Sequence, residues 1–218
     1  MNYDSVPLRD FKELNDWETV IFVYQSALKQ VETKIDILNG EFQHRHKYNP
    51  IEHVKSRIKT PESIVKKLKR HGYESSIENM VRYVNDIAGI RISCSFTSDI
   101  YLIADMISKQ NDLTILARRD YMKNPKKSGY RSYHMLVTTP VFLSDSIIDT
   151  KVEIQIRTVA QDFWATLEHK MHYKFEGDGP DYITKELREC ARYVAERGLP
   201  AWKNYNNRNP RNIGKLSE

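Results

Sequence analysis

In the segment Asp86-Ile87-Ala88-Gly89-Ile90-Arg91-Ile92-Ser93-Cys94-Ser95-Phe96, the hydrophobic pattern changes from a helical period to an alternating one. From Ile90 to Phe96 the even-numbered residues are apolar and the odd-numbered residues are polar. The same alternation returns in Lys151-Val152-Glu153-Ile154-Gln155-Ile156-Arg157. Because a period of two places neighbouring side chains on opposite faces of a strand, both segments are predicted to be half-buried strands.

Helical patterns surround these two strands. Apolar residues recur at three- and four-residue steps from Trp17, preceded by the candidate N-cap Asp16, to about Asn39-Gly40. Thr60-Pro61 has the form of an N-cap followed by proline at the first helical position, which predicts a short helix to about Arg70. The same periods predict further helices at 98–109, 159–173 and 183–197, and further strands at 113–117 and 133–139.

The composition favours one folded domain in the cytosol. A length of 218 residues suffices for a single core, and 40% hydrophobic with 29% charged residues excludes a disordered chain. No run approaches the roughly 20 apolar residues of a membrane span, and Met1 to Phe11 lacks the apolar segment of a secretory signal. Cys94 and Cys190 provide no disulfide framework. The net charge of +5 favours anionic partners.

The polar faces of the two strands hold chemically useful groups. Glu153, Gln155 and Arg157 share one side of the later strand, and Arg91 and Ser93 share one side of the earlier strand. If the two faces coincide, a carboxylate and two guanidinium groups converge. For either strand alone, the simpler interpretation is an antiparallel sheet with one solvated face.

Asp86 stands just before the earlier strand, next to the small pair Ala88-Gly89, where a ligand can approach the backbone closely. Together with Glu153 on a neighbouring strand, Asp86 offers the one or two carboxylates that Mg²⁺ needs when phosphates and water complete its coordination. The alternative is that Asp86 serves as an ordinary helix cap or turn residue.

A basic ridge leads into and along the short helix after Thr60. Its members recur at three- and four-residue steps and are Arg57, Lys59, Ser63, Lys67 and Arg70. Such a ridge can hold phosphate groups, although a solvated basic face is also common.

The loop 124–132, Asn-Pro-Lys-Lys-Ser-Gly-Tyr-Arg-Ser, combines a flexible Gly129 with Lys126, two further cations and the aromatic Tyr130. It can hold phosphate and stack a base, or it is a plain hairpin connection. It lacks the spacing of a Walker loop. His134 follows at the start of a strand and can hydrogen-bond a phosphate or base.

Three motifs together resemble the RelA/SpoT synthetase family: Asp86-Ile87-Ala88-Gly89-Ile90-Arg91, Gly129-Tyr130-Arg131-Ser132-Tyr133-His134 and Val152-Glu153-Ile154-Gln155-Ile156-Arg157-Thr158. Their order, spacing and surroundings agree with that family, and the similarity runs from about Asn49 to Tyr173. The chain is similar to the small, stand-alone alarmone synthetases. The segment Asn49-Pro50-Ile51-Glu52-His53 resembles the RelP branch more than the RelQ branch.

The resemblance implies an α/β (α+β) fold. A mixed, roughly five-stranded, nucleotidyltransferase-like sheet is expected between flanking helices, with long amphipathic helices at the N- and C-terminal ends. The resemblance divides the chain into an N-terminal helical region at 1–48, a catalytic core at 49–175, a C-terminal helical region at 176–205 and a flexible tail at 206–218.

The resemblance also implies a reaction, the synthesis of (p)ppGpp. The β,γ-pyrophosphate of ATP passes to the 3′-hydroxyl of GDP or GTP, AMP is released, and Mg²⁺ is required. The expected assembly is a cytoplasmic homotetramer. Because long members hydrolyse the product with a His-Asp pair and this sequence contains no His-Asp dipeptide, no hydrolase activity is expected.

The family's functional residues fall on positions already singled out. Catalysis and Mg²⁺ binding are assigned by the resemblance to Asp86 and Glu153, and Glu153 also activates the acceptor hydroxyl. The predicted ATP-binding residues are Arg57, Lys59, Ser63, Lys67, Arg70, Arg91 and Arg119, of which Arg57 and Arg91 embrace the adenine. The predicted GDP- or GTP-binding residues are Lys126, Tyr130, His134 and Gln155, of which Tyr130 stacks on the guanine.

Two other classes of protein remain open from the sequence. The positive charge and 13 tyrosines suit an RNA-binding module, for which Asp86 and Glu153 would be dispensable. RNA also remains a candidate regulator of an enzyme. A degenerate, scaffold-type member of the family would have lost a reactive position, and the predicted positions are all present.

Overall fold

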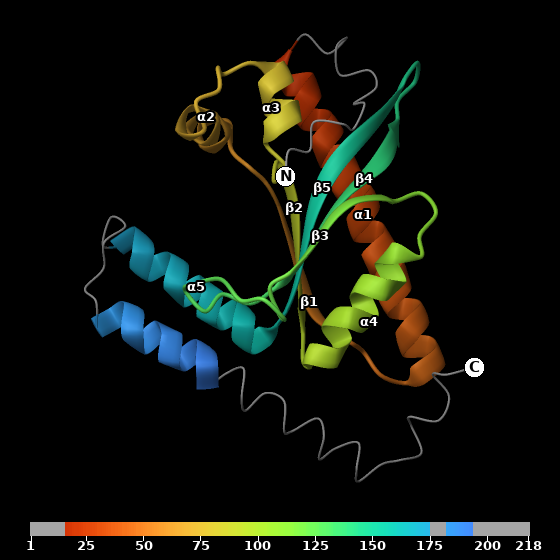
Figure 1. The fold of residues 1–218 in the computed structure, drawn as a ribbon. Coiled ribbons are helices and arrows are strands. Elements are labelled where there is room, and N and C mark those ends of the chain that lie inside the picture. Colours follow the sequence, from red (N-terminus) through yellow and green to blue (C-terminus); the bar gives the residue numbers. More distant parts are fainter. Residues whose placement is uncertain (1–15, 175–181, 194–218) are drawn as a thin grey trace.

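The computed structural model describes residues 16–174 and 182–193 (Figure 1). Its described strands form one mixed sheet in the order β1-β2-β5-β4-β3. They are β1 (Ile51–Ile58), β2 (Ala88–Cys94), β3 (Thr114–Asp120), β4 (Tyr133–Phe142) and β5 (Ile147–Thr158). Strands β2 and β5 are parallel, whereas the other neighbours are antiparallel. The predicted mixed, five-stranded sheet is confirmed.

Helices flank the sheet on both sides. They are α1 (Trp17–His46), α2 (Pro61–Arg70), α3 (Ile77–Tyr83), α4 (Thr97–Ser108) and α5 (Val159–Lys174), and residues 182–193 are also helical. In Figure 1, α1 and α4 lie on one side of the sheet and α5 lies on the other. The two faces of the sheet are therefore covered by different helices.

The face under α1 and α4 is the hydrophobic core. Ile90 and Ile92 of β2, and Ile154 and Ile156 of β5, are at most 1% exposed. The α1 side chains above them are also buried and recur at helical spacing: Val20, Val23, Tyr24, Ala27, Val31 and Ile35. Because strand side chains alternate, burying the even-numbered residues turns Arg91, Glu153 and Gln155 to the opposite face.

The prediction that the first helix ends near Asn39-Gly40 was wrong, since α1 continues to His46. Glu41 and Arg45 form an ion pair one turn apart, with 2.9 Å between Arg45 Nη2 and Glu41 Oε1. The helix ends where Lys47 adopts the left-handed conformation and its N–H donates to the Gln43 carbonyl. The cap at Lys47 therefore marks the C-terminal end of α1. Gly40 lies inside the helix, where glycine costs about 1 kcal/mol relative to alanine but does not end the helix.

Two elements were not predicted from the sequence. Strand β1 lies at the edge of the sheet and its burial pattern does not alternate, so it carries no period-two signal. Helix α3 has 7 residues, too few to show a helical period, and begins where the Ser76 side chain accepts from the Asn79 N–H. Of the helix predicted at 183–197, residues up to 193 are helical, whereas its last residues, the tail at 206–218 and Met1–Phe11 lie outside the described residues.

A buried lysine ties β5 to the loop that carries Asp86. Lys151 is 5% exposed, and its Nζ donates to the Arg82 carbonyl at 3.1 Å and to Asn85 Oδ1 at 2.8 Å. These bonds hold the segment between α3 and β2 against β5. Burial lowers the pKa of Lys151 to about 8.

This lysine predicts an unusual dependence of stability on pH. The unfolded chain keeps the Lys151 proton up to about pH 10.4, whereas the folded chain loses it near pH 8. Unfolding therefore takes up a proton in that window, and the free energy of unfolding rises with pH. Across this window, we expect the free energy of unfolding of the wild type to rise by up to about 3 kcal/mol relative to that of Lys151→Met. Urea unfolding across the window tests this, and a difference that does not change with pH contradicts it.

Candidate active site

Three pockets adjoin one another along the polar side of the sheet. The basic pocket is lined by Lys59, Ser63, Lys66, Lys67, Arg70 and Asp86. The central pocket is lined by Lys55, Ser56, Arg57, Asp86, Gly89, Ile90, Arg91, Glu153 and Gln155. The His134 pocket is lined by Asn85, Ala117, Arg119, His134, Met135, Leu136 and Glu153. Asp86 borders the first two pockets and Glu153 the last two, so the three pockets are neighbours that share these carboxylates.

The basic pocket is built around the carboxylate of Asp86. Lys59 Nζ is 2.8 Å from Asp86 Oδ2, and Lys67 Nζ is 2.6 Å from Asp86 Oδ1. Burial by itself raises the pKa of Asp86, but the hydrogen bonds from the two lysines outweigh it and hold the pKa below its usual value. Asp86 is therefore ionised at neutral pH. Helix α2, opened by the Thr60 cap, presents Lys67 to this carboxylate.

Strand register assembles the central pocket. Gly89 of β2 pairs with Arg57 of β1 on one side and with Glu153 of β5 on the other. Because glycine has no side chain, the space between the guanidinium and the carboxylate stays open for a ligand. Two residues further along, Arg91 pairs with Gln155 in the same way. Residues from three strands thus meet across one polar surface.

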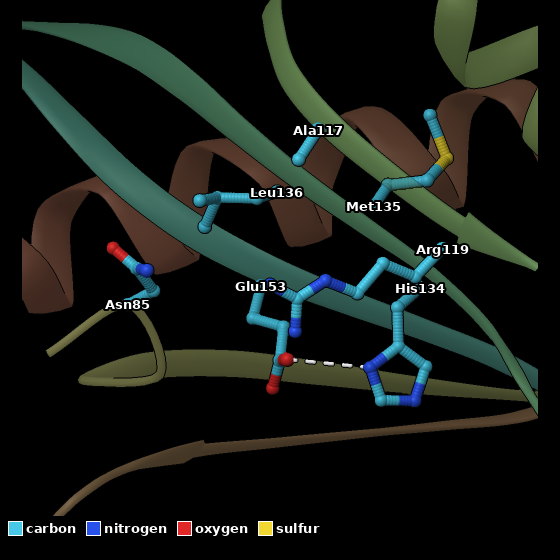
Figure 2. A pocket seen from close by; sticks show the side chains of 7 residues that line it. All are labelled: Asn85, Ala117, Arg119, His134, Met135, Leu136 and Glu153. Carbon is cyan, nitrogen blue, oxygen red and sulfur yellow. Dashed lines mark ion pairs between the residues drawn. The ribbon is translucent and has the colours of Figure 1, made fainter. Parts of the chain in front are cut away.

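Glu153 has polar partners on both carboxylate oxygens. His134 Nδ1 lies 3.3 Å from Glu153 Oε1 (Figure 2). Gln155 Nε2 donates to Glu153 Oε2 at 2.9 Å. Burial raises the pKa of Glu153, but His134 and Gln155 outweigh this effect and lower it, while the negative charge of Asp86 acts in the raising direction. Glu153 is therefore an ionised carboxylate in a fixed orientation, close enough to Asp86 to sense its charge.

The loop at residues 124–132 joins the site through Tyr130. It is called the acceptor loop because GDP or GTP is expected to be the nucleotide that accepts the pyrophosphate there. Its hydroxyl is 2.9 Å from His134 Nε2, and its ring is edge-on to the histidine with centroids 5.8 Å apart. Lys126 Nζ lies 4.8 Å from the Tyr130 ring centroid, and Arg157 Cζ lies 5.6 Å from it. Cations over an aromatic face stabilise its orientation. The Tyr130 ring is thus fixed beside the carboxylate site.

The structure brings together the residues that the sequence singled out. Most line one of the three pockets: Arg57, Lys59, Ser63, Lys67, Arg70, Asp86, Arg91, Arg119, His134, Glu153 and Gln155. Lys126 and Tyr130 join them through the contacts of the acceptor loop. Sequence reasoning missed Lys66 and Asn85, which line pockets, because a further lysine in a basic run and a lone asparagine carry no distinctive signal.

The carboxylates fit a magnesium ion that is held jointly with a nucleotide. Among the residues that the structure describes, no cluster of three or more His, Cys, Asp or Glu side chains could hold a metal alone. Asp86 and Glu153 nevertheless face the same pocket, and Mg²⁺ is typically bound by one or two carboxylates plus substrate phosphates. Lys59 and Lys67, next to Asp86, carry the positive charge that typically binds phosphate groups.

Gly129 gives the acceptor loop its shape. Its φ is +95°, its N–H donates to the Lys126 carbonyl, and a Cβ there would lie 2.8 Å from Ala191 Cβ. We expect Gly129→Ala to lower the free energy of unfolding by about 1–3 kcal/mol because alanine is strained at this φ and collides with the helix 182–193. Urea unfolding measures this.

Gly40→Ala is the matched control. A Cβ at Gly40 meets nothing within 4 Å, and the residue lies inside α1, so alanine is expected to stabilise the protein by about 0.5–1 kcal/mol. If Gly129→Ala leaves the free energy of unfolding unchanged or raises it, as expected for Gly40→Ala, the strain assigned to Gly129 is wrong.

The sequence and the fold match known proteins. The family model described as the region found in RelA / SpoT proteins matches residues 56–178. The chain is 47% identical to the GTP pyrophosphokinase YwaC of Bacillus subtilis over 85% of this chain and 90% of that protein. It is 35% identical to YjbM of the same organism over 80% and 82% of the two chains. The predicted RelP-like character is confirmed, since YwaC is the RelP-type protein of that pair.

Solved structures agree with the sequence comparison. The small alarmone synthetase 2 of B. subtilis superposes with a TM-score of 0.77 at 44% identity, covering 86% of this chain and 99% of that one. The small alarmone synthetase 1 of B. subtilis, solved bound to its product pppGpp, gives a TM-score of 0.79 at 32% identity, covering 88% and 97%. With a family model matched over more than half of its length and relatives covered almost end to end, this chain belongs to the RelA/SpoT family.

Proposed function

We propose that the protein is a GTP pyrophosphokinase that makes (p)ppGpp without hydrolysing it. The 3′-oxygen of GDP or GTP attacks the β-phosphorus of ATP, the bond from that phosphorus to the α,β-bridging oxygen breaks, and AMP leaves. The observation that carries the proposal is that Asp86 and Glu153 face one pocket, with a lysine-rich pocket on one side and an aromatic, histidine-containing site on the other.

The donor nucleotide is assigned to the basic and central pockets. Lys59, Ser63, Lys67 and Arg70 surround the phosphates there, and Arg57 and Arg91 flank the adenine. Arg119, on β3 opposite His134, adds a further phosphate or ribose contact. In support, a related small alarmone synthetase 1 has been solved bound to AMPCPP, at 30% identity and a TM-score of 0.73.

The acceptor nucleotide is assigned to the acceptor loop and the His134 pocket. Tyr130 stacks on the guanine, while Lys126, His134 and Gln155 contact the phosphates or the ribose. This leaves the 3′-hydroxyl beside Glu153, which accepts its proton as the new bond forms. The interactions of Glu153 with His134 and Gln155 fix the carboxylate for that task.

Phosphoryl-group transfer depends chiefly on positioning and charge neutralisation, which this site is built to supply. Bound Mg²⁺, held by Asp86 and Glu153, would neutralise phosphate charge in the transition state. Lys59 and Lys67, which contact Asp86, would contribute positive charge to phosphates bound beside that carboxylate. The site thus combines cations, which can bind the phosphates, with carboxylates, which can bind Mg²⁺.

The proposed setting is a cytoplasmic homotetramer. The support comes from the resemblance and from exposed apolar side chains such as Phe22 and Ile37 on α1, which are 54% and 65% exposed. The described helices include none that is long and apolar enough to cross a bilayer. The domain division at 1–48, 49–175, 176–205 and 206–218 also stands as a proposal.

Product analysis tests the function. Purified protein is incubated with ATP, Mg²⁺ and either GDP or GTP, and the nucleotides are separated by ion-exchange chromatography. We expect AMP and a 3′-pyrophosphorylated guanosine nucleotide in equal amounts. If neither acceptor gives a product while the protein retains RNA, the enzyme proposal fails in favour of an RNA-binding role.

A further inference from the structure

One acidic side chain outside the predicted site forms ion pairs with Arg91 and Arg157. Asp162 is buried on α5, which begins directly where β5 ends. The Thr158 N–H donates to Gln161 Oε1 at 2.8 Å, and the Gln161 N–H donates to Thr158 Oγ1 at 3.3 Å. This reciprocal cap fixes the first turn of the helix and holds Asp162 over the polar face of the sheet.

Basic side chains from three adjacent strands converge on this carboxylate. Arg91 Nη1 of β2 lies 3.3 Å from Asp162 Oδ1, and Arg157 Nη1 of β5 lies 3.7 Å from the same oxygen. His53 Nε2 of β1 lies 3.9 Å from Asp162 Oδ2. These contacts are ion pairs without a hydrogen bond to Asp162 Oδ1, and the negative charge of the carboxylate attracts both guanidinium groups.

Arg91 connects Asp162 to the donor subsite. Its side chain is 34% exposed, and it lines the central pocket together with Arg57, Asp86 and Glu153. The long side chain of arginine has many rotamers, so a fixed position for the guanidinium requires a partner at its end. Asp162 provides that partner from behind the pocket.

Arg157 connects the same carboxylate to the acceptor subsite. It is 2% exposed, and its Nη2 donates to Gln155 Oε1 at 2.6 Å. Gln155 in turn donates to Glu153, and the Arg157 guanidinium lies beside the Tyr130 ring. The chain of contacts from Asp162 therefore reaches both the proposed base and the proposed guanine stack.

Asp162 offsets part of the positive charge in this cluster. Burial lowers the pKa of Arg157, and the positive charge of Arg91 lowers it as well, whereas Tyr130 and Asp162 raise it. Without the carboxylate, the buried Arg157 guanidinium would face the half-exposed Arg91 guanidinium, and the two like charges would repel each other. Both would be expected to move away from their present positions.

We propose that Asp162 is a positioning residue shared by the two nucleotide subsites, which orients Arg91 for the donor and, through Arg157, orients Gln155 and Tyr130 for the acceptor. The inference rests on the proposed function, because that function assigns Arg91 and Tyr130 to different nucleotides. It predicts that one substitution on α5 weakens the binding of both substrates.

The test is the steady-state kinetics of Asp162→Asn. We expect the KM values for ATP and for GDP each to rise about tenfold or more, as for a displaced positioning group. Arg91→Ala should raise the KM for ATP by a smaller factor in the Asp162→Asn background than in the wild type, because the two residues act together. Asp105→Asn is the matched control, since Asp105 forms only an exposed ion pair with Lys109 on α4.

Several outcomes overturn the proposal. They are a rise in one KM alone, unchanged KM values together with a lower melting temperature, or the same rises in Asp105→Asn. If Asp162→Asn does not fold, Asp162→Glu keeps the charge but moves it by one methylene, and it must still raise both KM values together.

A failure of the proposed function is distinguishable from a failure of this inference. If the wild type forms no product, the proposed function fails. The comparison is then made on dissociation constants for a non-hydrolysable ATP analogue and for GDP, measured by calorimetry. A rise in both for Asp162→Asn supports the shared role, and a rise in neither or in one overturns it.

Discussion

Replacing Glu153 with glutamine is expected to lower kcat by about 10²–10⁴-fold, which is the contribution of a well-placed general base. Glutamine matches glutamate in shape but cannot accept the proton of the 3′-hydroxyl, and it is a poorer Mg²⁺ ligand. Because the glutamine side chain has nearly the same shape, it can occupy the space between His134 and Gln155 that Glu153 fills in the wild type. The rate of AMP release with saturating ATP and GDP measures the loss.

Glu78→Gln serves as the control for this variant. Glu78 is exposed on α3, away from the three pockets, and its substitution is expected to leave kcat unchanged. The melting temperatures of both variants should remain near that of the wild type. A Glu153→Gln enzyme with kcat within about threefold of the wild type would exclude Glu153 as the base.

Asp86→Asn is expected to reduce kcat/KM by at least about 10²–10³-fold, comparable to the loss of other electrostatic groups in active sites. The substitution removes a proposed metal ligand and also leaves Lys59 and Lys67 without the carboxylate that they now share. Both effects disturb the side of the site proposed to bind phosphates. We further expect the Mg²⁺ concentration for half-maximal activity to rise, because an amide oxygen binds the ion more weakly than a carboxylate.

A Mg²⁺ titration of the wild type, Asp86→Asn and Asp105→Asn distinguishes the two roles of Asp86. The control carboxylate lies in an exposed pair on α4 and should leave the titration curve unchanged. If Asp86→Asn loses activity but keeps the wild-type Mg²⁺ dependence, Asp86 acts only on the lysines. Full activity in this variant would remove Asp86 from the site altogether.

The sequence predicted which of these side chains come together because alternation constrains which side chains share a face. In β2 and β5, burial of Ile90 and Ile154 requires that Arg91 and Glu153 lie on the other side of the sheet. Asp86 and Glu153 could be placed near each other because Asp86 directly precedes β2, Glu153 lies on β5, and these two strands are neighbours. The resemblance added the assignment of each residue to a nucleotide.

Other features depend on contacts that no local pattern encodes. The pairing of Arg57 with Gly89 requires strand β1, which was missed because an edge strand with polar residues on both sides does not alternate. Asp162 lies in a helix that was predicted from the spacing of its apolar residues, and a single acidic residue there carries no distinctive signal. Its importance appears when α5 is placed across β2 and β5, where two arginines from separate strands meet it.

The transfer of an intact pyrophosphate group is tested most directly with ATP labelled in its phosphate chain. The enzyme is incubated with GDP and Mg²⁺ and with ATP carrying radioactive phosphorus at either the α or the γ position, and the products are separated. We predict that the γ label moves into the guanosine nucleotide and that the α label remains entirely in AMP. Release of the γ label as inorganic phosphate, with ADP as the other product and no labelled guanosine nucleotide, would contradict the account.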